Sequence, residues 1–319
     1  MGILYFHLVV DISLLIIIIN MSEKDLKIKE GYMPFLDYKV YYRIVGENTG
    51  NKKPLLLLHG GPGSTHNYFE VLDKLSILDG RMIISYDQLG CGNSYVEGHK
   101  ELWNLKTWID ELKAIREHLH LDELHILGQS WGGMLEIAYI SDEKPKGIKS
   151  AILSSTLSSS QLWGKEQHRR IKYLSQEDQD AIEKAEKSGN YSTKEYVDAN
   201  DHFMKRHCNY NVDENTPECL TRKKRFGTEA YETAWGPNEF TPVGNLKDFD
   251  YTEKLKEWNV PSLIISGTSD LCTPLIAKTM YDRIPGARWE LFENSKHCCF
   301  VDENGKYMNL LMEWLNKHD

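Results

Sequence analysis

The chain has 319 residues, of which 41% are hydrophobic and 27% are charged. This composition is typical of a globular protein with a sizeable core, and the length suits one large domain or a domain carrying an insertion. A formal net charge of −9 argues against a nucleic-acid partner, which would require clustered lysine and arginine. The six cysteines include no C-x-x-C pair, so we expect free thiols, no metal and a cytoplasmic location.

Residues 1–20 form an apolar segment that is interrupted by Asp11 and preceded by no lysine or arginine. A signal peptide needs a positive start and a cleavage site with small residues. A membrane span needs about twenty apolar residues without a central charge. We therefore expect translation to begin at Met21, with a membrane anchor or an export signal in residues 1–20 as the alternative.

Strand and helix patterns alternate from residue 21 to residue 157. An alternating, β-branched and aromatic stretch at 32–45 predicts a hairpin. An unbroken apolar run, typical of a strand buried on both faces of a parallel sheet, occurs at 55–58, and we interpret 81–86, 123–127 and 149–153 as further strands of this kind. Helical periodicity separates them at 66–78, 105–119 and 134–141. This rhythm predicts βαβ units and a doubly wound α/β sheet.

The rhythm breaks at residues 158–247, which are polar, charged and mostly helical in pattern, most clearly at 176–187 and 194–207. We interpret this stretch as an inserted helical cap above the carboxyl ends of the strands, where open α/β sheets bind ligands. Residues 21–157 and 248–319 then form the two parts of the core. The second part repeats the pattern with strands at 262–266 and 288–292 and helices at 276–283 and 307–316.

The segment 128–132 (GQSWG) matches the G-x-S-x-G pattern of a nucleophile elbow. An apolar strand leads into it and a helical pattern leads out, which is the context that this motif requires. The turn would lift the hydroxyl of Ser130 above the sheet at a helix N-terminus, where developing negative charge is favoured. Ser130 is therefore the predicted nucleophile.

A serine nucleophile needs a base, and the base needs an orienting acid. In this arrangement the chain order is serine, acid, histidine. Asp270 follows the strand at 262–266, and His297 follows the strand at 288–292. Both positions lie at the carboxyl ends of strands, so we predict that Asp270 and His297 complete a triad with Ser130.

A glycine cluster at 59–63 (HGGPG) follows the buried strand at 55–58. Glycines allow the backbone to approach a substrate and to direct an N–H group at a developing oxyanion. We predict that the N–H groups of Gly61 and Trp131 form the oxyanion hole.

Four motifs together resemble the proline iminopeptidases, which are α/β-hydrolase aminopeptidases that include the tricorn-interacting factor of archaea. The motifs are HGGPG at 59–63, YDQLGCGNS at 86–94, GQSWGG at 128–133 and GPNEF at 236–240. The resemblance extends over nearly the whole chain after residue 31, cap included. It implies the α/β-hydrolase fold and an enzyme that releases one N-terminal residue, often proline, from short peptides without metal or other cofactor.

An enzyme of this kind must bind the protonated α-amine of its substrate, which requires a carboxylate. Glu239 matches the cap glutamate to which the family assigns this task. Relatives of the tricorn-factor type have a second glutamate directly after the catalytic aspartate, where this chain has Leu271. Trp131 and Trp235 are candidate walls of a flat pocket for a pyrrolidine ring. Gly60 is predicted to contact the substrate as well.

Other functions use the same residues. An amino-acid amidase or arylamidase would act at the same site on a smaller leaving group, and Leu271 makes it the nearest alternative. A carboxylesterase would need no amine anchor. From a different class, the fold also serves as a ligand-binding receptor with little turnover, and the sequence leaves the oligomeric state open.

Overall fold

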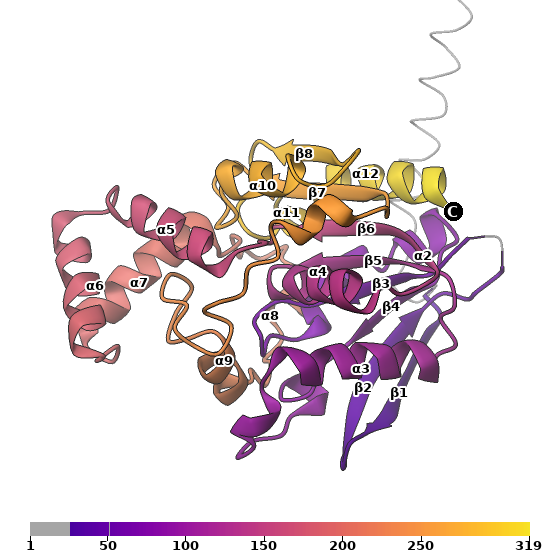
Figure 1. The fold of residues 1–319 in the computed structure, drawn as a ribbon, viewed down its shortest axis with the longest axis horizontal. Coiled ribbons are helices and arrows are strands. Elements are labelled where there is room, and N and C mark those ends of the chain that lie inside the picture. The colour runs from indigo at the N-terminus through magenta and orange to yellow at the C-terminus, as the bar shows by residue number, and fades with distance from the viewer. Residues whose placement is uncertain (1–25, 51) are drawn as a thin grey trace, which may run out of the picture.

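One mixed sheet of eight strands organises the chain, in the spatial order β1-β2-β4-β3-β5-β6-β7-β8 (Figure 1). The computed structural model describes residues 26–50 and 52–319, so the segment 1–20 and the proposed start at Met21 lie outside the described residues. Strand β2 pairs antiparallel with both of its neighbours, and the other adjacent pairs are parallel. The strands are β1 (Ile28–Phe35), β2 (Tyr38–Val45), β3 (Leu55–Leu58), β4 (Ile83–Tyr86), β5 (Leu124–Gln129), β6 (Ile148–Ser154), β7 (Ser262–Gly267) and β8 (Arg288–Phe292).

Strand β3 explains how the sheet divides the core into two layers. Its four leucines are buried, and successive side chains of a strand point to opposite faces. Leu56 and Leu58 join the cluster that includes helices α3, α4 and α10, whereas Leu55 and Leu57 join the cluster that includes helix α12. The predicted doubly wound α/β class is therefore confirmed. These helices are α3 (Leu105–His118), α4 (Trp131–Glu143), α10 (Pro274–Tyr281) and α12 (Asn304–His318).

The prediction of one continuous helix at 66–78 is wrong for most of that range. The structure has a 3₁₀ helix at His66–Leu72 and a single α-turn, α2, at Leu75–Leu78. Side chains of this segment are bound to distant partners: His66 to Asp87, and Asp73 to Arg43 through two hydrogen bonds. Such tertiary contacts override the local helical preference.

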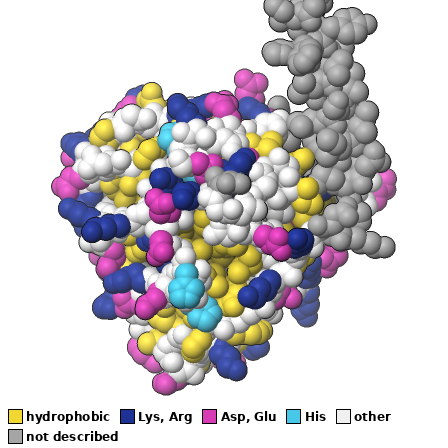
Figure 2. Space-filling view, turned by 90° about the vertical axis from the view of Figure 1, so that its right-hand side faces the viewer, with side chains coloured by type: hydrophobic (Ala, Val, Ile, Leu, Met, Phe, Trp, Pro, Cys, Tyr) yellow, Lys and Arg dark blue, Asp and Glu magenta, His cyan; other side chains and the backbone are white. Residues whose placement is uncertain are grey.

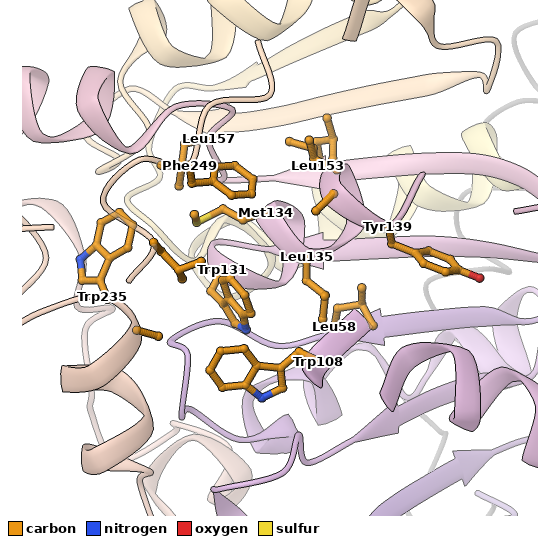
Figure 3. Close-up of a cluster of buried hydrophobic side chains, with 14 of the residues drawn as sticks. Leu58, Trp108, Trp131, Met134, Leu135, Tyr139, Leu153, Leu157, Trp235 and Phe249 are labelled. Atoms are coloured by element: carbon orange, nitrogen blue, oxygen red, sulfur yellow. The ribbon is translucent and has the colours of Figure 1, made fainter. Parts of the chain in front are cut away.

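Five α-helices lie between β6 and β7, and all of them fall within residues 158–247. They are α5 (Ser160–Ile171), α6 (Gln176–Ser188), α7 (Lys194–His207), α8 (Glu218–Thr221) and α9 (Thr228–Ala234). Helices α5, α6 and α7 lie beyond one end of the sheet, at the left in Figure 1. Trp235 and Phe249 belong to the same buried cluster as Trp131 and Met134 of α4, so apolar packing joins this region to the core (Figure 3).

Short helices complete the described chain: 3₁₀ turns at Gly92–Ser94, Lys100–Leu102 and Lys254–Glu257, and α11 at Cys299–Asp302. In the part of the chain that the structure describes, no helix is long and apolar enough to cross a membrane. The face opposite α5–α7 shows acidic and basic side chains interspersed with apolar ones (Figure 2). This mixture suits a solvated surface.

Candidate active site

Ser130 sits in a sharp turn between β5 and α4. Its backbone has φ 55° and ψ −123°, in the left-handed half of conformational space that a residue other than glycine seldom adopts. The residue is the N-cap of α4 and is 8% exposed. Strain of this kind persists only where the surroundings fix it, and it is common at functional sites. The geometry is that of the predicted nucleophile elbow.

Glycine at position 132 permits this turn because α4 starts in contact with the end of β3. A Cβ atom at Gly132 would lie 2.0 Å from the carbonyl oxygen of Leu58. Since His59 and the glycine cluster follow Leu58 directly, this contact also places the nucleophile elbow beside the HGGPG loop.

Asp270 and His297 form a hydrogen-bonded pair. The Nδ1 atom of His297 lies 2.7 Å from Oδ1 of the buried Asp270. The carboxylate also accepts hydrogen bonds from the backbone N–H groups of Gly267 and Cys272. An ionised carboxylate is acceptor-only, so this pairing places the proton of the neutral imidazole on Nδ1 and leaves Nε2 free to act as a base.

Helix α5 holds the turn that carries Asp270. Gln167 donates a hydrogen bond to the carbonyl oxygen of Leu271, at 2.8 Å, and Arg170 donates one to the carbonyl oxygen of Asp270. Glu166 accepts a hydrogen bond of 2.7 Å from the hydroxyl of Thr273. These three α5 residues were not predicted, because nothing in their local sequence indicates contact with a turn about a hundred residues away.

The HGGPG loop brings two backbone N–H groups to the site. Gly61 has φ 116°, which favours glycine, and its peptide bond to Pro62 is cis. Among the described residues, the N–H groups of Gly61 and Trp131 donate to no backbone or side-chain acceptor. They are thus available to a ligand. The N–H of Gly60 is already occupied, since it donates to the hydroxyl of Tyr68 at 2.6 Å.

A buried side-chain network fixes the loop and the elbow to each other. The indole Nε1 of Trp131 donates to Oε1 of Gln88 at 2.7 Å, and the Gln88 amide donates to the carbonyl oxygen of His59 at 3.1 Å. His59 accepts the backbone N–H of Gln88 through Nε2, and burial lowers its pKa to about 4. The imidazole is therefore neutral, and its Nδ1 donates to the carbonyl oxygen of Gly60.

Glu239 lies in the turn that follows α9. Asn238 shapes this turn because its side-chain oxygen accepts the backbone N–H groups of Phe240 and Thr241. The Glu239 carboxylate accepts a hydrogen bond of 2.8 Å from the hydroxyl of Tyr231. Burial raises the pKa of Glu239, while the charge of His297 and the Tyr231 hydrogen bond act in the opposite direction.

Ser130, His297 and Glu239 line one cavity of about 760 Å³, together with Gly60 and Gly61. This size falls in the usual range for small-ligand sites. The cavity thereby gathers the predicted nucleophile, base and carboxylate in one space.

The two tryptophans predicted as pocket walls, and Leu271, are not among the residues that line this cavity. The ring of Trp131 points into the core, edge-on to Trp108 at 5.0 Å between ring centroids (Figure 3). Trp235 is also buried and packs against Trp163, whose ring lies 5.9 Å from that of His297. Leu271 is buried in the apolar core. The position at which relatives of the tricorn-factor type have a second glutamate is therefore used for apolar packing.

The six cysteines are free, and three of them adjoin the acid and the base. Cys272 and Cys299 are buried, whereas Cys298 lines the cavity. Burial raises the pKa of Cys298 to about 12, so its thiol stays protonated and is a poor nucleophile. Within residues 26–50 and 52–319, no group of three or more potential ligands is arranged to hold a metal ion.

The sheet order and the serine elbow define the class of protein, an α/β-hydrolase. In agreement, the sequence profile of the alpha/beta hydrolase fold family matches residues 53–304. The proline iminopeptidase of Clostridium botulinum is 63% identical over 294 residues, which are 92% of this chain and all of that protein. The Clostridioides difficile proline iminopeptidase is 61% identical over 294 residues, again 92% of this chain and all of that protein. The chain therefore belongs to the proline iminopeptidases of the α/β-hydrolase fold family.

Solved structures agree with this family. The structure of VinJ superposes with a TM-score of 0.83 at 30% identity, over 91% of this chain and 99% of that one. The proline iminopeptidase of Mycobacterium smegmatis gives a TM-score of 0.81 at 29% identity, over 91% of this chain and 98% of that one.

Replacing Gly132 by alanine tests the elbow. The new Cβ would collide with the Leu58 carbonyl, so we expect Gly132→Ala to lower the free energy of unfolding by about 1–3 kcal/mol and to abolish activity. The matched control is Gly305→Ala in α12, where a Cβ meets no atom within 4 Å and helix propensity predicts a gain of about 0.5–1 kcal/mol. Denaturant titration measures both, and a Gly132→Ala protein as stable as the wild type would contradict the proposed contact.

Proposed function

We propose that this protein is a serine aminopeptidase that releases an N-terminal residue, preferentially proline, from short peptides through an acyl-enzyme. The observation that carries the proposal is the single cavity shared by Ser130, His297 and the carboxylate of Glu239. A hydrolytic serine alone would suit an esterase equally well. The partly buried carboxylate in the same cavity provides a partner for a free α-ammonium group.

The steps follow from the positions of these groups. Glu239 binds the α-ammonium of the substrate and thereby places the first carbonyl carbon at Ser130. His297 accepts the hydroxyl proton through Nε2 as the oxygen attacks, and Asp270 holds the imidazole through Nδ1. The N–H groups of Gly61 and Trp131 stabilise the oxyanion.

The tetrahedral intermediate collapses when the C–N bond breaks. His297 gives its proton to the leaving amine, and an ester remains between Ser130 and the released residue's acyl group. Water then attacks this ester by the same route, with His297 again as the base. The reaction consumes one water and needs no cofactor.

We also propose a cytoplasmic location. Free cysteines persist in reducing compartments, and in this chain none of the six is paired with another in the described structure. The substrates would then be short peptides formed inside the cell.

Three arylamides compared side by side test the activity: the prolyl, the alanyl and the N-acetyl-prolyl derivatives. We expect strong turnover of the prolyl compound, weaker turnover of the alanyl compound and none after acetylation, because acetylation removes the charge that Glu239 binds. The measurement is kcat/KM, with Ser130→Ala as the blank. Equal turnover of the acetylated compound would mean a general amidase or esterase.

Glu239→Gln tests the amine anchor directly. Hydrogen bonds between charged groups are worth about 1.5–3 kcal/mol, so kcat/KM for prolyl arylamide should fall about ten- to hundredfold. Because burial raises the pKa of Glu239, the ratio of wild-type to variant kcat/KM should also decline as falling pH protonates this carboxyl. Taking the ratio at each pH cancels the acid loss of activity that a general base imposes on both proteins. The control is Glu232→Gln in α9, an exposed residue outside the cavity. An unchanged kcat/KM in Glu239→Gln would rule out the anchor.

A further inference from the structure

Lys224 lines the cavity that contains Ser130 and also borders a neighbouring cavity beside Asp87. It lies in the segment between α8 and α9 and lines the cavity wall together with Tyr68 and Cys298. Its Nζ atom lies 5.2 Å from the centroid of the Tyr68 ring. The hydroxyl of that same tyrosine binds Gly60 and the side chain of Gln129, the residue before the nucleophile. The lysine therefore approaches the site from the side of the HGGPG loop.

This ammonium group has no anion of its own. Within the described chain, no carboxylate oxygen lies within 4.0 Å of its Nζ atom, and it donates no hydrogen bond. Asp87 attracts it at longer range, but that carboxylate is already bound by His66 and by the backbone N–H of Asn93. Burial lowers the pKa of Lys224, as expected for a cation without a close partner.

The cavity thus has two fixed charges of opposite sign. Among the described residues that line it, Glu239 is the one carboxylate and Lys224 is the one lysine or arginine. Glu239 is bound by Tyr231 of α9, whereas Lys224 lies against Tyr68, whose hydroxyl binds the HGGPG loop, so the two charges have different neighbours in the cavity wall. A dipeptide also has two charges, an α-ammonium at one end and a carboxylate at the other, with the scissile bond between them.

We propose that Lys224 binds the C-terminal carboxylate of a dipeptide substrate and so makes dipeptides the preferred substrate class. The inference rests on the proposed aminopeptidase function, because Glu239 must hold the other end. The carboxylate belongs to the leaving residue, whose side chain would lie against the apolar part of the wall formed by Tyr210, Leu220 and Phe226. A longer peptide or an amide presents no charge at this place and leaves Lys224 unpaired.

The test compares prolyl-alanine with prolyl-alanine amide and with prolyl-alanyl-alanine. In the wild type we expect kcat/KM for the dipeptide to exceed that for its amide about ten- to hundredfold, the range for a hydrogen bond between charged partners. In Lys224→Met this ratio should fall towards one, and in Lys224→Arg most of it should return. A ratio within one variant is insensitive to a general loss of folded enzyme.

Lys223→Met is the matched control, since Lys223 is exposed and does not line this cavity. It should keep the wild-type ratio. A wild-type ratio near one, or a ratio that Lys224→Met leaves unchanged, would overturn the proposal. Neither result would touch the aminopeptidase function, because prolyl arylamide has no carboxylate and its loss of turnover on acetylation tests Glu239 separately.

Discussion

The contact between Gly132 and the end of β3 is the constraint on which the site depends. It allows α4 to begin directly against the carbonyl oxygen of Leu58, and this approach holds Ser130 in its left-handed conformation. The HGGPG loop starts at the next residue, so the position of the loop relative to the nucleophile follows from the same contact. Gln88 then fixes the two by bonding Trp131 and His59 together. The glycines of both motifs are thus parts of one packing arrangement.

Helix α5, the first helix after β6, helps to hold the turn that carries Asp270. A buried aspartate is costly unless its oxygens are bonded, and Asp270 meets this requirement through His297 and two backbone N–H groups. Those N–H groups lie at the correct places because Gln167 and Arg170 of α5 bind the carbonyl groups of the same turn. Folding of α5 against the core and positioning of Asp270, the proposed catalytic acid, are therefore coupled.

Features that a local pattern of residues encodes can be predicted from the sequence, namely the strands and the residues that follow them. Apolar runs and the alternation of strand and helix patterns predict the strands; β3, which is buried, and β8, which is mostly half-buried, both have the predicted bounds. Ser130, Asp270 and His297 each follow such a strand, so topology alone places them at one edge of the sheet. The contacts of Tyr68, Lys224 and Arg170 join segments far apart in the chain, and no local pattern marks them. Trp235 lies near the GPNEF motif, but the demand for apolar packing turns its ring into the core.

The electrostatics of the cavity explain how a mainly apolar wall could select a charged substrate. Burial disfavours the charged forms of Glu239 and Lys224, which shifts the pKa of the first upward and that of the second downward. A bound dipeptide places an ammonium beside one and a carboxylate beside the other, so both charges become paired and no net charge enters the cavity. A peptide lacking either terminus leaves one buried charge without a partner, and breaking such a pair costs several kcal/mol. Selectivity for dipeptides would then arise chiefly from the penalty imposed on a substrate that lacks one charge. The remaining contacts with the cavity wall are the same for a dipeptide and for its amide.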